Sequence, residues 1–326
     1  MQVTVLGATG FIGGQIARAA VARGWRVRAA RRHAGAVGAI GDMPVEWVEA
    51  NLADETSLAR AMRESEILFH AAASYPQDFR NIPRAVAQAG QEMQRVLRAA
   101  RQAGVRRLVY TSSLTTLGLA GPGRLADESL FYTPGAARSA YFEAKYAMEQ
   151  IALRASHDAA AGLDVVVLLP SAVFGPGDVK PTTSVVIRDA ARGRYPFYFD
   201  AAINAVDGRD VAWTHLAAAE RGRSGERYIV GGHNLTLRQL LDTVDAIAGR
   251  RQMRVRVSRR LVRALIGLTD RLPFTHVPEN FRTFEFWQPV SSHKAQTELG
   301  HAIRPFEDTV RDTLVWFQET SAPTPR

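Results

Sequence analysis

The stretch GATGFIGG, residues 7–14, follows the short apolar run QVTVL at residues 2–6 and opens a helical pattern. Glycines at this spacing allow a tight strand-to-helix turn, a close backbone approach to a pyrophosphate, and close packing of the helix on the strand. Because the pattern stands between a strand and a helix, it predicts a dinucleotide-binding βαβ unit. The predicted cofactor contacts in this turn are Gly7, Thr9, Gly10, Phe11, Ile12 and Gly13.

The first two-thirds of the chain alternates short β-branched runs with helical patterns, which is typical of βαβ units around a parallel sheet. Strands are predicted at residues 2–6, 26–30, 45–49, 67–70, 107–111 and 165–169, and helices at 14–23, 58–63, 85–103 and 140–155. The predicted fold class is therefore α/β, a doubly wound parallel sheet (Rossmann) whose ligands bind at the carboxyl ends of the strands.

The regular alternation fades after Pro170. We therefore predict a dinucleotide-binding domain in residues 1–169 and mainly a smaller C-terminal substrate-binding lobe in residues 170–326. Segments near 204–222 and 286–300 are expected to return to the first domain. Further helices are predicted at 237–248 and 259–272.

The composition is that of a globular protein, with 326 residues of which 46% are hydrophobic and 22% charged. The absence of cysteine excludes disulfides, a thiol nucleophile and a cysteine metal site, and no metal site is predicted. No run reaches the roughly 18 uncharged apolar residues that would indicate a membrane span. The opening MQVTVLG is typical of a strand rather than a signal peptide, so a cytoplasmic protein is expected.

Arginine supplies almost all of the positive charge: the formal net charge is +9, and lysine occurs only at positions 145, 180 and 294. Arg31 and Arg32 follow the second predicted strand, where an acid usually meets the free ribose of NAD(H). Guanidinium groups suit a 2′-phosphate instead. The sequence therefore favours NADP(H) over NAD(H).

A second arginine-rich run, RRQMRVRVSRR at residues 250–260, leads into SRRLVRALIGLTDRL at residues 258–272. A basic, partly amphipathic pattern of this kind can rest on a lipid surface. A helix that covers a core is the more common interpretation, so membrane contact through 258–272 is not the expected outcome. No aromatic residue interleaves with these arginines, and a nucleic-acid partner is not expected.

Tyr141 and Lys145 are four residues apart in a predicted helix, so they share one face of it. A nearby ammonium favours the phenolate and lowers the pKa of a tyrosine toward the working range of a proton donor or acceptor. The pair is therefore a candidate proton-transfer centre.

Five motifs stand in order along the chain: GATGFIGG, HAAA at 70–73, YTSS at 110–113, Tyr141 with Lys145, and LPSAVFGPGD at 169–178. In this order the chain resembles the extended short-chain dehydrogenase/reductase family, within the NAD-dependent epimerase/dehydratase superfamily. The segments DVKPT, RYIVGGHNLTLRQLL and KAQTELG most resemble dihydroflavonol-reductase-like proteins and hopanoid-associated sugar epimerases. The resemblance implies a nicotinamide cofactor, a small-molecule substrate and a homodimer.

The resemblance implies a catalytic role for Tyr141 as the acid/base and for Lys145 as the group that lowers its pKa and holds the nicotinamide ribose. Ser113, preferred over Ser112, is implied as the hydrogen-bond donor to the substrate oxygen. Cofactor contacts are also implied for Asn51, Leu52, Ala71, Ala72, Ala73, Pro170 and Val173. The substrate pocket is expected to include Tyr75, Phe174 and Lys180.

Two positions depart from the family pattern, because Asn51 replaces an acid before Leu52 and Ala89 stands where an asparagine is common. His70 is expected to be an ordinary core histidine. Carboxylates follow the active-site serine in the dehydratases of this family. Here Leu114, Thr115 and Thr116 follow Ser113, which disfavours dehydration.

Hydride transfer between a nicotinamide and a carbon bearing oxygen is the chemistry that the family shares. An NADP(H)-dependent reductase, which moves a hydride between nicotinamide and a carbonyl or secondary alcohol of a small organic substrate, is favoured by Arg31 and Arg32. A sugar or nucleotide-sugar epimerase is the enzyme alternative. A non-catalytic, nicotinamide-sensing regulatory protein is the alternative from another class.

Overall fold

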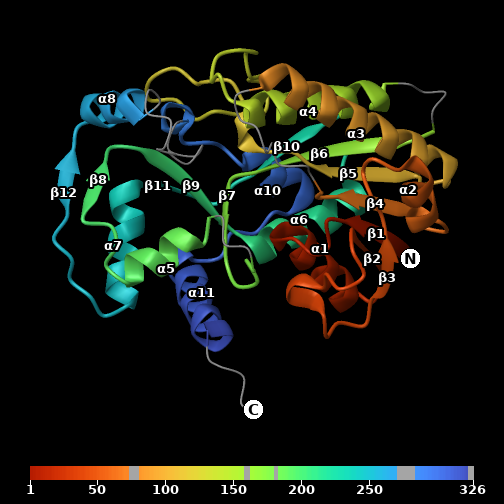
Figure 1. Cartoon of the computed structure of the whole chain (residues 1–326), viewed down its shortest axis with the longest axis horizontal. Coiled ribbons are helices and arrows are strands. Elements are labelled where there is room, and N and C mark those ends of the chain that lie inside the picture. The colour runs from red at the N-terminus through yellow and green to blue at the C-terminus, as the bar shows by residue number, and fades with distance from the viewer. Residues whose placement is uncertain (73–80, 158–161, 180–182, 270–282, 322–326) are drawn as a thin grey trace.

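A seven-stranded parallel sheet forms the centre of the computed structural model, which describes residues 1–72, 81–157, 162–179, 183–269 and 283–321 (Figure 1). The strand order is β10-β6-β5-β4-β1-β2-β3. The strands are β1 (Gln2–Leu6), β2 (Arg26–Arg31), β3 (Glu46–Glu49), β4 (Ile67–His70), β5 (Arg107–Thr111), β6 (Asp164–Pro170) and β10 (Arg227–Val230). The predicted doubly wound α/β fold is confirmed.

Strand β10 is a correction to the six strands predicted for this sheet. Its four residues, RYIV, are all buried and pair in parallel with β6. So short a run carries little periodic signal, and only pairing with β6 makes it a sheet strand.

Two layers of helices cover the sheet, one on each face (Figure 1). One core gathers side chains of α2, α3 and α4 against the sheet, and the other gathers those of α1, α6 and α10. The buried side chains of α3, among them Met93, Val96, Leu97 and Ala100, recur every three or four residues. These helices are α1 (Phe11–Ala22), α2 (Glu55–Met62), α3 (Ile82–Gln102), α4 (Ala140–Ser156), α6 (Gly208–Arg221) and α10 (His293–Leu299).

The remaining elements build a smaller lobe beside the carboxyl edge of the sheet. It contains a three-stranded sheet, β11-β9-β7, and a two-stranded sheet, β12-β8. Its strands are β7 (Ala172–Phe174), β8 (Phe197–Phe199), β9 (Ala202–Asp207), β11 (His233–Thr236) and β12 (Val255–Val257). Its helices are α5 (Val185–Ala191), α7 (Leu237–Ile247), α8 (Arg259–Thr269) and α11 (Phe306–Ser321).

The chain crosses between the two parts several times after residue 170. Helices α6 and α10 and strand β10 pack with the large sheet, whereas β9, which supplies residues 202–207, pairs with β11 and β7. Strand β9 contributes to both parts, since Val206 packs in the same core as α1 and α6.

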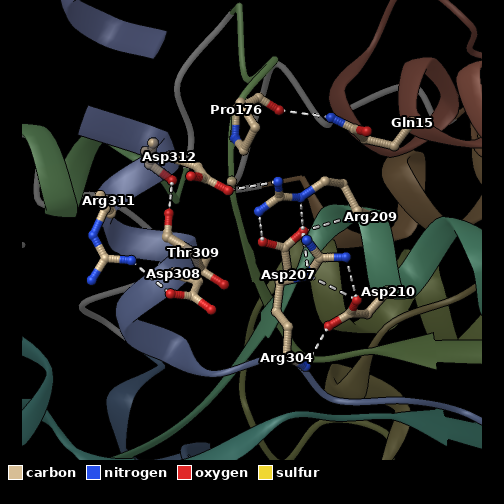
Figure 2. A network of polar contacts seen from close by, with 12 residues as sticks. Gln15, Pro176, Asp207, Arg209, Asp210, Arg304, Asp308, Thr309, Arg311 and Asp312 are labelled. Atoms are coloured by element: carbon tan, nitrogen blue, oxygen red, sulfur yellow. Dashed lines mark hydrogen bonds and ion pairs between the residues drawn. The ribbon is translucent and has the colours of Figure 1, made fainter. Parts of the chain in front are cut away.

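A charged network fixes the start of α6 against α11 (Figure 2). Asp207 caps α6 and is fully buried, and Arg209 joins it, at 2.8 Å, to Asp312 of α11, at 2.7 Å. Arg304 pairs with Asp210 at 2.8 Å. Burial raises the pKa of Asp207, but its hydrogen bonds to Arg209 outweigh this, and the net pKa lies below its ordinary value. Asp207 is therefore held as a carboxylate by its neighbours.

Candidate active site

The glycine turn between β1 and α1 is built by close backbone contacts. Gly7 has a φ of +88°, and a Cβ atom there would lie 2.8 Å from the Ala72 nitrogen. A Cβ atom at Gly13 would lie 2.1 Å from the Gly7 carbonyl oxygen. A side chain at Gly7 would collide with the backbone that follows β4, and one at Gly13 would collide with the backbone of Gly7. Glycine is therefore required at both positions, as the sequence predicts.

The N-terminus of α1 fits a phosphate group. Its N-cap is Gly10, which supplies no side-chain cap, and no acidic residue lies in the first turn. Backbone N–H groups and the helix dipole at such a terminus favour an anion. Thr9, Phe11 and Ile12 lie at this turn, as predicted from the sequence.

Arg31 closes β2 and lies beside Trp47, with its guanidinium carbon 5.1 Å from the ring centroid. Its Nε atom is buried and has no hydrogen-bond partner among the described residues. A buried guanidinium N–H without an acceptor is costly, and a bound anion would satisfy it. Arg32 follows in an exposed position. This donor set fits the phosphate-bearing ribose of a dinucleotide.

Asn51 begins the turn into α2, where the sequence predicts an adenine contact. Its Oδ1 atom accepts a hydrogen bond from the Ala53 backbone at 3.0 Å, and its own N–H donates to Ser57 Oγ at 3.0 Å. Leu52 packs against the core. The side-chain oxygen of Asn51 thus shapes the turn, a role that a carboxylate can also serve.

Two serines follow strand β5, and their side chains meet different partners. Ser112 Oγ donates to the Glu149 carboxylate, whereas the Ser113 side chain lies close to that of Tyr141 and lowers its pKa. Ser113 also caps the short helix η2 (Leu114–Thr116). The structure therefore brings Ser113 and Tyr141 together and turns Ser112 away from that pair.

Tyr141 and Lys145 lie in the first half of α4, which begins after the N-cap Ser139. The Lys145 ammonium donates to the Thr111 carbonyl at 3.1 Å and lies 5.5 Å from the centre of the Tyr110 ring. Both groups are on β5, so Lys145 is held against the strand end that carries Ser113.

The pKa of Tyr141 differs from the prediction. Burial raises it, and the hydrogen bond with Ser113 offsets only part of that rise. The expectation that Lys145 lowers this pKa is wrong, because the ammonium is directed to the Thr111 carbonyl and the Tyr110 ring. Burial lowers the pKa of Lys145 to about 8, and Glu149 opposes that shift.

Glu149, which the sequence analysis did not select, lies one turn beyond Lys145 on the same helix. Its side chain is completely buried, and its Oε1 atom is 2.8 Å from Nε of Arg227 on β10. This contact is an ion pair without the alignment of a regular hydrogen bond. The four-residue spacing of Lys145 and Glu149 could have shown that both lie on one face of the helix. The pairing of Glu149 with Arg227 could not be predicted, because Arg227 lies on a distant strand.

His70 and Tyr110 lie beside each other, with ring centroids 5.5 Å apart, and both are fully buried. Burial and the nearby Lys145 lower the pKa of His70 to about 3, so this imidazole is neutral at ordinary pH. This agrees with the expected core role of His70.

The residues predicted near the nicotinamide and the substrate divide into four groups. Pro170 ends β6, and Val173 lies on β7 with only 6% of its surface exposed. Phe174 requires a correction, because its ring is fully buried against Phe306, 5.9 Å away, and so packs in the core of the lobe rather than facing a substrate. Ala71 and Ala72 border the glycine turn, whereas Ala73, Tyr75 and Lys180 lie outside the described residues.

Internal ion pairs account for several members of the arginine-rich run. Arg254 pairs with Asp245 through an almost completely buried side chain, and Arg256 pairs with Asp200. Across the described ranges, no helix has both the length and the apolar character needed to cross a bilayer. Nor do the described residues contain a group of three or more side chains suited to a metal ion.

Comparison with known proteins establishes the family. The profile of the "NAD dependent epimerase/dehydratase family" matches residues 3–231, and the chain belongs to this family. It is thus a nicotinamide-dinucleotide-dependent enzyme of the extended short-chain dehydrogenase/reductase superfamily, whose chemistry is that of an oxidoreductase. The sequence-based recognition of this family is confirmed.

Individual relatives carry different names. A Synechocystis sp. protein provisionally named dihydroflavonol 4-reductase is 32% identical over 329 residues, which cover 96% of this chain and 94% of that protein. Sterol demethylase protein B of Methylococcus capsulatus is 31% identical over 330 residues, covering 98% and 99%. A nucleoside-diphosphate-sugar epimerase from Pseudomonas aeruginosa has a structure with 28% identity, a TM-score of 0.84 and 98% coverage of both chains.

Proposed function

We propose that this protein is an NADP(H)-dependent oxidoreductase that moves a hydride between nicotinamide and a carbonyl or secondary alcohol of a small organic substrate. The observation that carries the proposal is the close approach of Ser113 and Tyr141 at the carboxyl end of β5, with Lys145 one helical turn away. Such an edge is where doubly wound folds bind their ligands.

The roles follow from the chemistry of these side chains. Tyr141 donates a proton to the substrate oxygen during reduction, and Ser113 donates a hydrogen bond to the same oxygen. Lys145 holds the ribose next to the nicotinamide. The hydride comes from the nicotinamide when the cofactor is bound.

The choice of NADP(H) is supported by the buried Nε of Arg31, which has no hydrogen-bond partner in the described part of the chain, and by the exposed Arg32 next to it. A 2′-phosphate presents acceptors to both guanidinium groups and balances their charge. Replacing Arg31 with alanine should weaken NADPH binding by roughly ten-fold or more and leave NADH binding nearly unchanged, which is the preference that a phosphate contact produces.

The test is an absorbance assay of the purified protein with NADPH and a panel of ketones and aldehydes. Oxidation of NADPH is expected with at least one of them, and Tyr141→Phe should abolish it while NADPH still binds. Tyr146→Phe, a tyrosine replacement on the same helix, is the matched control and should keep activity.

Epimerase chemistry is the second candidate, favoured by the name of the Pseudomonas aeruginosa relative. An epimerase retains its cofactor through oxidation and re-reduction, so NAD(H) that co-purifies with the protein would support it. Turnover of a nucleotide sugar with no oxidation of NADPH by any carbonyl compound would overturn the reductase proposal. Unchanged turnover in Tyr141→Phe would overturn the assignment of Tyr141.

A further inference from the structure

A buried carboxylate lies beneath the residues of the proposed site. Glu149 is completely buried on α4, four residues after Lys145, so both side chains project from the same face of the helix. A fully buried carboxylate is rare unless other groups balance its charge. Its partners therefore indicate what it holds in place.

Three of these partners come from outside α4. The Glu149 carboxylate accepts hydrogen bonds from Ser112 Oγ and, at 2.7 Å, from Thr116 Oγ1, and it pairs with Arg227 of β10 at 2.8 Å. Ser112 and Thr116 flank Ser113 on the two sides, and Thr116 Oγ1 also lies 2.8 Å from the Ser113 carbonyl oxygen. One carboxylate thus fixes the backbone on both sides of the serine that meets Tyr141.

Glu149 also acts on Lys145 through its charge. Among the described residues, the groups that face the Lys145 side chain are the Thr111 carbonyl and Tyr110 ring on β5, the neutral His70 on β4, and Glu149 on α4. Burial raises the pKa of Glu149, and its contacts with Arg227, Ser112, Thr116 and Lys145 oppose that rise. Glu149 is the acidic group of this set, and it raises the pKa of Lys145 against the effect of burial. Arg227 balances the rest of its charge.

We propose that Glu149 is a positioning residue of the site, which keeps Lys145 charged and holds the strand end that carries Ser113. Its effect on the charge of Lys145 stands independently, whereas its effect on catalysis rests on the proposed function. Glu149 itself is shielded from substrate by the residues it binds, so it acts through Lys145 and Ser113.

The charge on Lys145 can be measured in the free protein. The chain has lysine only at positions 145, 180 and 294, so competitive acetylation across a pH series, read by mass spectrometry of peptides, follows Lys145 separately. In the wild type its reactivity should titrate near pH 8. In Glu149→Gln, which keeps a hydrogen-bond acceptor but loses the charge, the midpoint should fall by roughly one unit or more.

Glu143→Gln is the matched control. Glu143 is another buried glutamate of α4. Its carboxylate contacts a different set of groups, since it accepts hydrogen bonds from the Tyr132 hydroxyl at 2.7 Å and from the Gly135 backbone at 2.6 Å. Its replacement should leave the Lys145 midpoint unchanged. A midpoint that does not move in Glu149→Gln, or that moves equally in Glu143→Gln, would overturn the proposal.

The catalytic part is tested by the pH profile of kcat/KM with NADPH. Loss of activity with rising pH should begin about one unit lower in Glu149→Gln than in the wild type, because Lys145 loses its proton at lower pH. A uniform fall in activity with an unmoved profile indicates a merely structural role and overturns the proposal. A wild type without reductase activity refutes the proposed function, while the acetylation midpoints still decide the effect of Glu149 on Lys145.

Glu149→Gln leaves Arg227 buried and unpaired, which can prevent folding. The double variant Glu149→Gln/Arg227→Met removes the ion pair as a unit and avoids a lone buried charge. It too should lower the acetylation midpoint of Lys145, and a midpoint equal to that of the wild type would contradict the proposal.

Discussion

The contact between Gly13 and the Gly7 carbonyl gives a prediction whose size follows from the structure. In Gly13→Ala the new Cβ atom would lie 2.1 Å from the Gly7 oxygen and 2.6 Å from its carbonyl carbon, whereas ordinary contact begins near 3.4 Å. Both obstacles are backbone atoms, so no side chain can turn aside. Helix α1 must therefore move by roughly 1 Å away from the turn.

Such a shift should have two measurable effects. Forcing an extra methyl group into a packed site costs about 1–3 kcal/mol, which lowers the melting temperature by several degrees. The backbone N–H groups at the start of α1 move with the helix, so NADPH affinity should fall by roughly 10- to 100-fold.

Gly14→Ala is the matched control for helix propensity. A Cβ atom there would be 3.3 Å from the Ala8 oxygen and 3.7 Å from a methyl group of Ile40, contacts that need only a small adjustment. Both variants gain up to about 1 kcal/mol from replacing a helical glycine, so their difference isolates the clash. Thermal melting and titration of NADPH by fluorescence measure it. If Gly13→Ala melts and binds NADPH as Gly14→Ala does, the reasoning from backbone contact is refuted.

Three further outcomes are expected. Ser113→Ala should slow NADPH-dependent turnover about 100-fold with an unchanged melting temperature. Ser112→Ala should instead destabilise the fold by about 1–3 kcal/mol, because the buried Glu149 carboxylate loses a hydrogen-bond donor. Equal effects of the two variants on turnover and on melting temperature would contradict the separate roles. Arg209→Ala should lower the free energy of unfolding at pH 7 by about 2 kcal/mol, measured with urea, because it leaves the buried Asp207 without its partner, while the partial exposure of Arg209 limits the loss. Arg311→Ala, at an exposed ion pair, should lower it by less than about 1 kcal/mol. The pKa of Asp207 is lower in the folded protein than in the unfolded chain, where it is about 3.9. The stabilisation is therefore present above about pH 3.9 and is lost as the pH falls through the folded-state pKa. If the stability difference between wild type and Arg209→Ala stays constant in acid, the Asp207–Arg209 pair is not its source.

The sequence predicted a feature correctly where the contacts that produce it lie within one short segment of the chain. The glycine turn is an example, because Gly7 and Gly13 are required by contacts within a single βα unit and with the residues that follow β4. The six predicted strands lie within one residue of the observed ones at each end, since each is a short apolar run between clear breaks. Ser113 was also separated from Ser112, and the structure indeed turns these two side chains to different partners.

Long-range contacts were beyond the sequence. Strand β10 exists as a sheet strand because β6 lies beside it, and Phe174 is buried because Phe306, far along the chain, packs on it. The direction of the Tyr141 pKa shift was also wrong, since burial depends on what surrounds the ring and not on its spacing from Lys145.

By itself, the sequence determined the family and the doubly wound sheet, and it predicts the Ser113, Tyr141 and Lys145 cluster. Spacing within a strand or helix predicts the sheet and the Tyr141–Lys145 pair, because neighbours in the chain stay neighbours in the fold, whereas Ser113 follows from the family resemblance. Only the tertiary structure decided the electrostatics of the cluster, since Glu149, the carboxylate that acts on Lys145, is itself paired with Arg227 from the distant strand β10. The energies of buried charges depend on what else is buried with them, and the order of residues does not record that.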